Sequence, residues 1–113
     1  MGFGRLNGYE GALDLIGDIG SQSIDFVFGM DDAILTGGIK AFEDAGKIMG
    51  EDIVAIGAVC NGNRNLFNDG KQYGTTLQSP LHEGQLAIKL VDEYITTGAL
   101  KKFINFTPNP PIS

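Results

Sequence analysis

The sequence predicts an α/β fold, in which alternating helices and strands form an open, mostly parallel sheet with helices on both faces. Segments with helical spacing of apolar residues alternate with short runs of β-branched and aromatic residues. Only short connections, rich in glycine and polar residues, separate these segments. Strands that alternate with helices across short loops run parallel and are joined by right-handed crossovers.

The first helix is predicted from four apolar residues near the start of the chain. Leu6, Tyr9, Leu13 and Ile16 are spaced by three, four and three residues, which places them on one face of a helix. Gly20 follows, and glycine commonly ends a helix.

A strand, a helix and a second strand are predicted next. The run 24–28 is apolar enough to predict a strand that is buried on both faces. Asp31 and Asp32 then occupy the position of an N-cap, and the apolar residues after them predict a helix ending near Gly46. The run 52–59 predicts a second buried strand.

The second half of the chain continues the alternation. Residues 63–70 predict at most a short helix, and residues 73–77 predict a third strand. Pro80 suits the first position of a long helix over 80–98. Residues 102–106 predict a fourth short strand. The long helix carries a stripe of apolar residues, namely Leu81, Leu86, Leu90, Val91, Tyr94 and Ile95.

Composition excludes several classes of protein. The 113 residues make one domain at most, and a net charge of −6 with only eight Lys and Arg residues predicts no nucleic-acid surface. The apolar runs are too short to cross a bilayer, and no signal peptide opens the chain. Glycine is unusually frequent, with 17 residues, and its scatter between periodic segments is typical of turns and helix ends.

Polar residues follow three of the predicted strands. They lie in Gly29–Asp32, Val59–Asn63 and Gln78–Ser79. The carboxyl ends of parallel strands meet at one edge of the sheet, where ligands of such folds bind. The sequence therefore predicts a ligand-facing edge built from these corners.

The adjacent carboxylates of Asp31 and Asp32 allow three interpretations. They can hold Mg²⁺ in a phosphoacceptor domain, accept hydrogen bonds from the hydroxyls of a polyol, or cap the next helix. A Mg²⁺ site needs further acidic ligands, and the other corners offer amides. No catalytic residue, metal site or cofactor is therefore predicted, and a Mg²⁺-dependent phosphoacceptor remains the alternative of a different class.

The corner after the second strand contains amides and the single cysteine. Cys60 has no histidine near it in the sequence, and we expect it to be a small buried hydrophobic residue. Asn61 and Gly62 form a turn dipeptide. Asn61 and Asn63 can also offer amides to a ligand, although turn formation alone explains Asn63.

Three segments together resemble one family. "SIDFVFGMDDAILTGGIKAFEDAGK", "GEDIVAIGAV" and "NDGKQYGTTLQSPLHEGQLAIKLVDEYITTG" are similar, in this order and spacing, to periplasmic sugar-binding proteins of the ribose-binding type. These are the solute receptors of ABC importers, and repressor-like sugar sensors share their pattern. Family members are more than twice as long, so the resemblance implies that residues 1–113 form a single C-terminal-lobe fragment, half of the periplasmic-binding-protein type 1 fold.

The resemblance also implies site residues. The ligand-contacting position after the first strand falls at Asp31, and the helix-starting position falls at Asp32. For the contact after the next strand we favour Asn61 over the two residues before it, because Asn61 is polar and precedes a glycine. The glutamine of the hinge falls at Gln78. These four residues are the predicted ligand-binding set for a small carbohydrate.

Partners and location follow from the same resemblance. It implies that the full-length protein binds an ABC permease and is periplasmic, or extracellular and lipid-anchored; a repressor or sensor effector domain is the alternative. In the family the helix over 80–98 packs on the N-terminal lobe. Without that lobe its stripe would expose about 300–600 Å² of apolar surface, so we expect a homo-oligomer through this helix.

Overall fold

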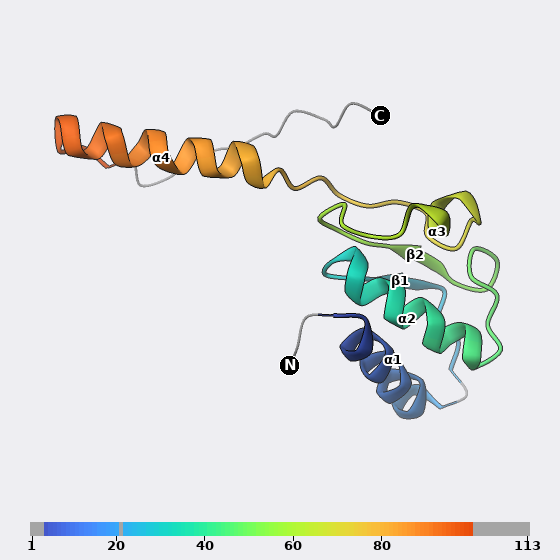
Figure 1. The fold of residues 1–113 in the computed structure, drawn as a ribbon. Coiled ribbons are helices and arrows are strands. Elements are labelled where there is room, and N and C mark those ends of the chain that lie inside the picture. Colours follow the sequence, from blue (N-terminus) through green and yellow to red (C-terminus); the bar gives the residue numbers. More distant parts are fainter. Residues whose placement is uncertain (1–3, 21, 101–113) are drawn as a thin grey trace. The chain divides into compact units, whose positions relative to one another are not determined.

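The computed structural model describes residues 4–20 and 22–100. Its elements are helix α1 (Arg5–Ile19), strand β1 (Phe26–Phe28), helix α2 (Asp32–Asp44), strand β2 (Val54–Ile56), helix α3 (Arg64–Asn68) and helix α4 (Pro80–Thr97) (Figure 1). The chain divides into two compact units, Met1–Thr76 and Leu77–Ser113. Of the elements in the described residues, the first unit holds all except α4.

The predicted open sheet is wrong. The described residues form four helices and one parallel sheet of two strands, in which Phe26 pairs with Val54 and Phe28 with Ile56. The predicted third strand, 73–77, is reduced to one bridge between Ile56 and Gly74. The predicted fourth strand, 102–106, lies outside the described residues.

The backbone after β2 explains why the third strand is so short. Tyr73 donates to Ala55, and Gly57 donates to Gly74, so the pairing begins as a parallel ladder. Val59 and Cys60 then have φ values of 77° and 59°, far from extended backbone. Because β2 turns away at this point, the residues after Gly74 have no extended partner beside them.

Strand β1 is covered on one face, so the prediction that residues 24–28 are buried on both faces is wrong. Val27 packs against the core, whereas Phe26 is 53% and Phe28 56% exposed. Successive side chains of a strand point to opposite faces, and in the described part of the chain the face of β1 that carries Phe26 and Phe28 is left largely uncovered. Phe28 and Met30 also line a largely apolar hollow of about 330 Å³ between β1, α1 and α2.

The core of the first unit lies around α2. Leu35, Ile39 and Phe42 are buried and recur at helical spacing. They form one cluster with Ile53, which directly precedes β2, and Ala55, which lies in β2. Figure 1 shows α1 beside α2, and α3 on the other side of the strands. The order of layers is therefore α1, α2, the two strands and α3.

Glycines make the close contact between α1 and α2. A Cβ atom at Gly8 would overlap the backbone carbonyl of Ile34, and one at Gly37 would overlap that of Arg5. These two glycines are inside helices, so the general interpretation of the glycines as turn and helix-end residues is wrong for them. The missing side chains let the two backbones approach more closely than larger residues allow.

The predicted helix ends are largely confirmed. Gly70, with φ of 72°, follows α3 at the predicted position. Pro80 is in the first turn of α4, and Gly98, with φ of 71°, ends it by donating to the Tyr94 carbonyl. Proline has no N–H to lose at a helix start, and glycine adopts left-handed backbone without strain.

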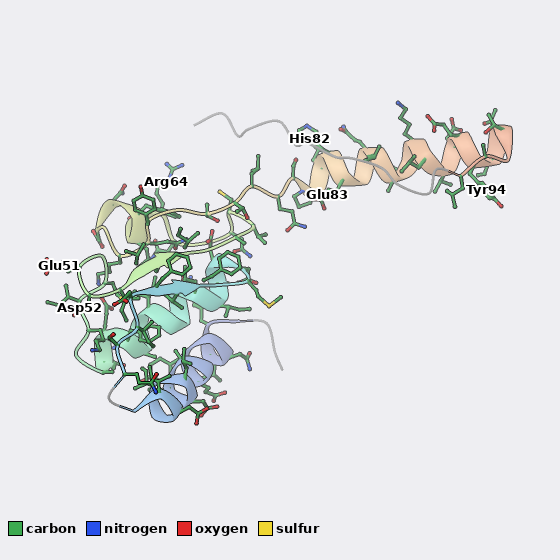
Figure 2. All side chains as sticks on the ribbon, turned by 180° about the vertical axis from the view of Figure 1, so that it is seen from behind. Glu51, Asp52, Arg64, His82, Glu83 and Tyr94 are labelled. Carbon is green, nitrogen blue, oxygen red and sulfur yellow. The ribbon has the colours of Figure 1, made fainter. Side chains whose placement is uncertain are left out.

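Helix α4 belongs to the second unit and has no buried residue. Figure 2 shows His82, Glu83 and Tyr94 as side chains on this helix. Among the helices of the described residues, none is both long enough and apolar enough to span a membrane.

Candidate functional site

The candidate site is the corner where β1 and β2 end, in the first unit. The N–H of Gly29 donates to the Ile56 carbonyl at 2.9 Å, which extends the strand pairing by one residue. The N–H of Asp32 then donates to the Ala58 carbonyl at 3.0 Å. The two loops that follow the strands are thereby joined, as parallel strand ends require.

Asp31 is the N-cap of α2. Its Oδ1 accepts a hydrogen bond from the N–H of Ile34 at 2.7 Å, and its backbone is extended as a cap residue requires. The residue is half-buried, and no protein donor to Oδ2 is recorded among the described residues. Asp31 therefore combines a capping role with an oxygen that can accept from a ligand hydroxyl.

Asp32 is fully buried, with 0% of its surface exposed. Gln72 Nε2 donates to its Oδ1 at 2.7 Å, and the Thr75 hydroxyl donates to its Oδ2 at 2.9 Å. Its position in the first turn of α2 adds a favourable interaction with the helix dipole. Its two oxygens are thus satisfied by neutral donors from the segment that follows α3.

Asn61 is exposed on the turn after β2. Its neighbour Gly62 lies directly against Asp32, because a Cβ atom on Gly62 would overlap the Cβ of that side chain. Gly57 lies against the same carboxylate and the Gln72 amide. The structure therefore brings the predicted residues Asp31, Asp32 and Asn61 to one corner.

The structure changes one interpretation of the turn and agrees with another. Cys60 is exposed and has positive φ, so the prediction of a small buried hydrophobic residue is wrong. Even in a continued strand, Cys60 would lie on the same face as the exposed Val54, because successive side chains point to opposite faces. Asn63 caps α3, since its Oδ1 accepts from the N–H of Asn65 at 3.0 Å, which agrees with a purely structural role.

Gln78 belongs to the second unit of the chain. It is exposed, and its Nε2 donates to Glu83 Oε2 at 3.3 Å. Ser79, the N-cap residue of α4, makes no capping bond; its Oγ lies 2.8 Å from His82 Nδ1. Gln78 therefore stays a predicted ligand residue.

Gln72 and Thr75 are the residues that sequence reasoning missed. Gln72 is only 2% exposed, and its Nε2 also donates to the Gly74 carbonyl at 3.1 Å. Its Oε1 is buried and has no hydrogen-bond partner among the described residues. The one signal in the sequence is an amide directly before the predicted strand 73–77, and this signal does not indicate which residue the amide binds.

The shifted pKa values lie away from this corner. The Lys40 ammonium and then the Tyr9 hydroxyl donate to Asp44 and hold the pKa of that carboxyl below its ordinary value. Lys71 pairs with Glu43 at 2.6 Å, and this hydrogen bond raises the pKa of Lys71. The ion pair between Lys71 and Glu43 joins the residue before Gln72 to helix α2.

The corner offers groups that can form hydrogen bonds. No group of three or more His, Cys, Asp or Glu side chains that could hold a metal ion is found in the part of the chain that the structure describes. Asp31 offers a carboxylate oxygen, and Asn61 offers an amide with two donors and an acceptor. This combination matches hydroxyl groups, which both donate and accept.

Comparison of the chain with protein-family models, with curated protein sequences and with solved structures finds no match in any of the three.

Proposed function

We propose that this chain is the C-terminal part of a sugar-binding receptor for an ABC importer and contacts a small carbohydrate through Asp31 and Asn61. The observation that carries the proposal is the corner at the ends of β1 and β2. Asp31 and Asn61 are on separate loops that meet at the same edge, because the Asp32–Ala58 hydrogen bond and the contact of Gly62 with Asp32 join these loops. The ordered resemblance of three sequence segments to ribose-type receptors supports the same chemistry.

The proposal extends to partners and location. The full-length protein would deliver its sugar to an ABC permease and would act outside the cytoplasm, where such receptors work. The same corner would also serve the effector domain of a sugar-responsive repressor or sensor, which differs in its attached domains rather than in its sugar chemistry.

Titration of the chain with ribose, galactose, xylose and arabinose, followed by amide NMR shifts, tests the proposal. We expect shifts at Asp31 and Asn61 with at least one sugar. The dissociation constant should be millimolar or weaker, which corresponds to a binding free energy on the order of −4 kcal/mol. Binding should be this weak because one lobe leaves the other face of the ligand in water. Asn61→Ala should weaken this binding, whereas Asn68→Ala, an exposed amide at the end of α3, should not.

Two results would count against the proposal. Absence of shifts at both corner residues with all four sugars would remove the assigned site. A micromolar complex would show that the site is complete within this chain, against a receptor of two lobes.

The Mg²⁺-dependent phosphoacceptor has less support from the geometry. It needs Asp31 and Asp32 to coordinate the ion together. Both oxygens of Asp32 are instead hydrogen-bonded to Gln72 and Thr75, and the side chain is buried. Specific shifts at both aspartates on titration with Mg²⁺ would favour this alternative over sugar binding.

A further inference from the structure

The turn that carries Asn61 has an unfavourable backbone. Val59 and Cys60 both have positive φ, at 77° and 59°. Residues other than glycine rarely adopt this region, and β-branched residues such as valine are especially disfavoured there. Such a backbone persists only where the surrounding structure holds it, so the turn needs an anchor.

The Thr75 side chain supplies that anchor. Its Oγ1 accepts a hydrogen bond from the N–H of Cys60 at 3.2 Å and donates its proton to Asp32 Oδ2 at 2.9 Å. A hydroxyl has one proton and two lone pairs, so giving the proton to the carboxylate leaves a lone pair for the Cys60 amide. The hydroxyl thus joins the turn to Asp32.

Asp32 is a rigid point of attachment. It is fully buried in the first turn of α2, and Gln72 holds its other oxygen at 2.7 Å. Gly57 and Gly62 lie against the same side chain, and each would clash with it if it carried a Cβ atom. The carboxylate is therefore enclosed by the turn on one side and by the segment 72–75 on the other.

We infer that Thr75 is a positioning residue for the ligand corner: through the buried Asp32 carboxylate it holds the 59–62 turn in the conformation that presents Asn61. Asp32 then contributes to ligand binding through the turn rather than by touching the ligand. The inference rests on the proposed function, since it assigns the group that orients one of the proposed sugar contacts.

Hydrogen exchange of the Cys60 amide tests the anchor in the 113-residue chain without any ligand. Thr75→Val keeps the shape of the side chain and removes the hydroxyl. We expect about tenfold faster exchange of the Cys60 amide, because this amide loses one hydrogen bond. Thr75→Ser should restore slow exchange. Thr76→Val, an exposed neighbour, is the matched control and should change nothing. The amide of the buried Ile39 reports global unfolding, so the ratio of the two rates isolates the turn.

Thr75→Ala repeats the test if the added methyl of Thr75→Val prevents folding. Unchanged exchange at Cys60 in the variants without the hydroxyl, or failure of Thr75→Ser to restore it, would overturn the inference.

The sugar titration then separates this inference from the proposed function. If the unaltered chain gives sugar-dependent shifts at Asn61, Thr75→Val should reduce them at each sugar concentration and Thr75→Ser should restore them. Full shifts in Thr75→Val would overturn the positioning role. If no sugar binds the unaltered chain, the proposed function fails, and the exchange rates alone decide whether Thr75 holds the turn.

Discussion

Asp31 and Asp32 are neighbours in the sequence and have different roles in the structure. Asp31 caps α2 from a half-buried position, whereas Asp32 lies fully inside and binds two side chains of the 72–75 segment. A buried carboxylate is costly unless its oxygens are hydrogen-bonded. Gln72 and Thr75 meet that requirement, which makes this small network a condition for the corner to form.

Replacing each aspartate by alanine should separate these roles. Asp32→Ala should lower the free energy of unfolding by about 2–4 kcal/mol, because the buried Gln72 amide loses one of its two acceptors and the Thr75 hydroxyl loses the nearer of its two acceptors. Asp31→Ala is the matched control and should cost about 1 kcal/mol, the usual value for an N-cap. Urea unfolding followed by circular dichroism measures both. Equal losses in the two variants would contradict the distinction.

At the scale of elements, the packing of α1 on α2 depends on absent side chains. Gly8 of α1 and Gly37 of α2 are each in contact with the backbone of the other helix. Alanine normally favours a helix over glycine by about 1 kcal/mol. The contact between the helices should outweigh that preference wherever the added methyl has no room.

Gly37→Ala should therefore destabilise the chain by about 1–3 kcal/mol, the usual cost of overpacking. Gly11→Ala, also inside a helix, should stabilise it by about 0.5–1 kcal/mol, because nothing lies within 4 Å of the added methyl. The two variants add the same atoms, so thermal unfolding of both isolates the effect of space. A stabilised Gly37→Ala variant would show that the helices are farther apart than described.

The half-buried Tyr9 and the exposed Lys40 and Asp44 also join these helices. The donors lower the pKa of Asp44 in the folded chain, so on acidification the unfolded chain binds this proton first. The contribution of Asp44 is complete above the ordinary carboxyl range and is lost as the pH falls below about 4.

Melting temperatures measured from pH 7 to pH 2 check this sign. Asp44→Asn should melt slightly lower than the unaltered chain at pH 7, and the difference should shrink toward zero at pH 2. The effect is small because surface ion pairs contribute little. Tyr9→Phe, which removes only the second donor, should show a smaller difference with the same trend. A gap that widens on acidification would contradict the assignment.

At the scale of the whole molecule, α4 carries more apolar surface than a solvated helix usually has. Leu86, Leu90 and Tyr94 lie along one side, and Ile88, Val91 and Ile95 lie along the adjacent side. Apolar residues therefore occupy more than half of its circumference. A helix of this kind is normally covered by protein on more than one side.

We expect the chain to self-associate through α4, as the sequence predicts, either side by side or by exchange of the helix between copies. Sedimentation over a range of concentrations measures this. Val91→Glu should weaken the association by placing a charge in the apolar stripe, whereas Gln85→Glu, on the polar side, should leave it unchanged. A compact monomer at high concentration would indicate that α4 folds back within its own chain.

The sequence by itself determined the helices, their ends and two of the three predicted strand-end corners, those after β1 and β2. Periodic apolar residues with Asp31, Pro80 and Gly98 at the boundaries are local signals, and local hydrogen bonds satisfy them. The corner was also predictable, because Asp31, Asp32 and Asn61 follow their strands directly and parallel strand ends share an edge.

Only the tertiary structure decided the extent of the sheet, the burial of Asp32 and the importance of Gln72 and Thr75. Gln72 and Thr75 are 40 and 43 residues from Asp32 along the chain, and no local pattern links residues so far apart. The backbone of Val59 and Cys60 likewise shortens the third strand through a conformation that neither residue type favours. Such features arise when distant segments pack and their polar groups must find partners, so they are properties of the folded chain rather than of any one segment.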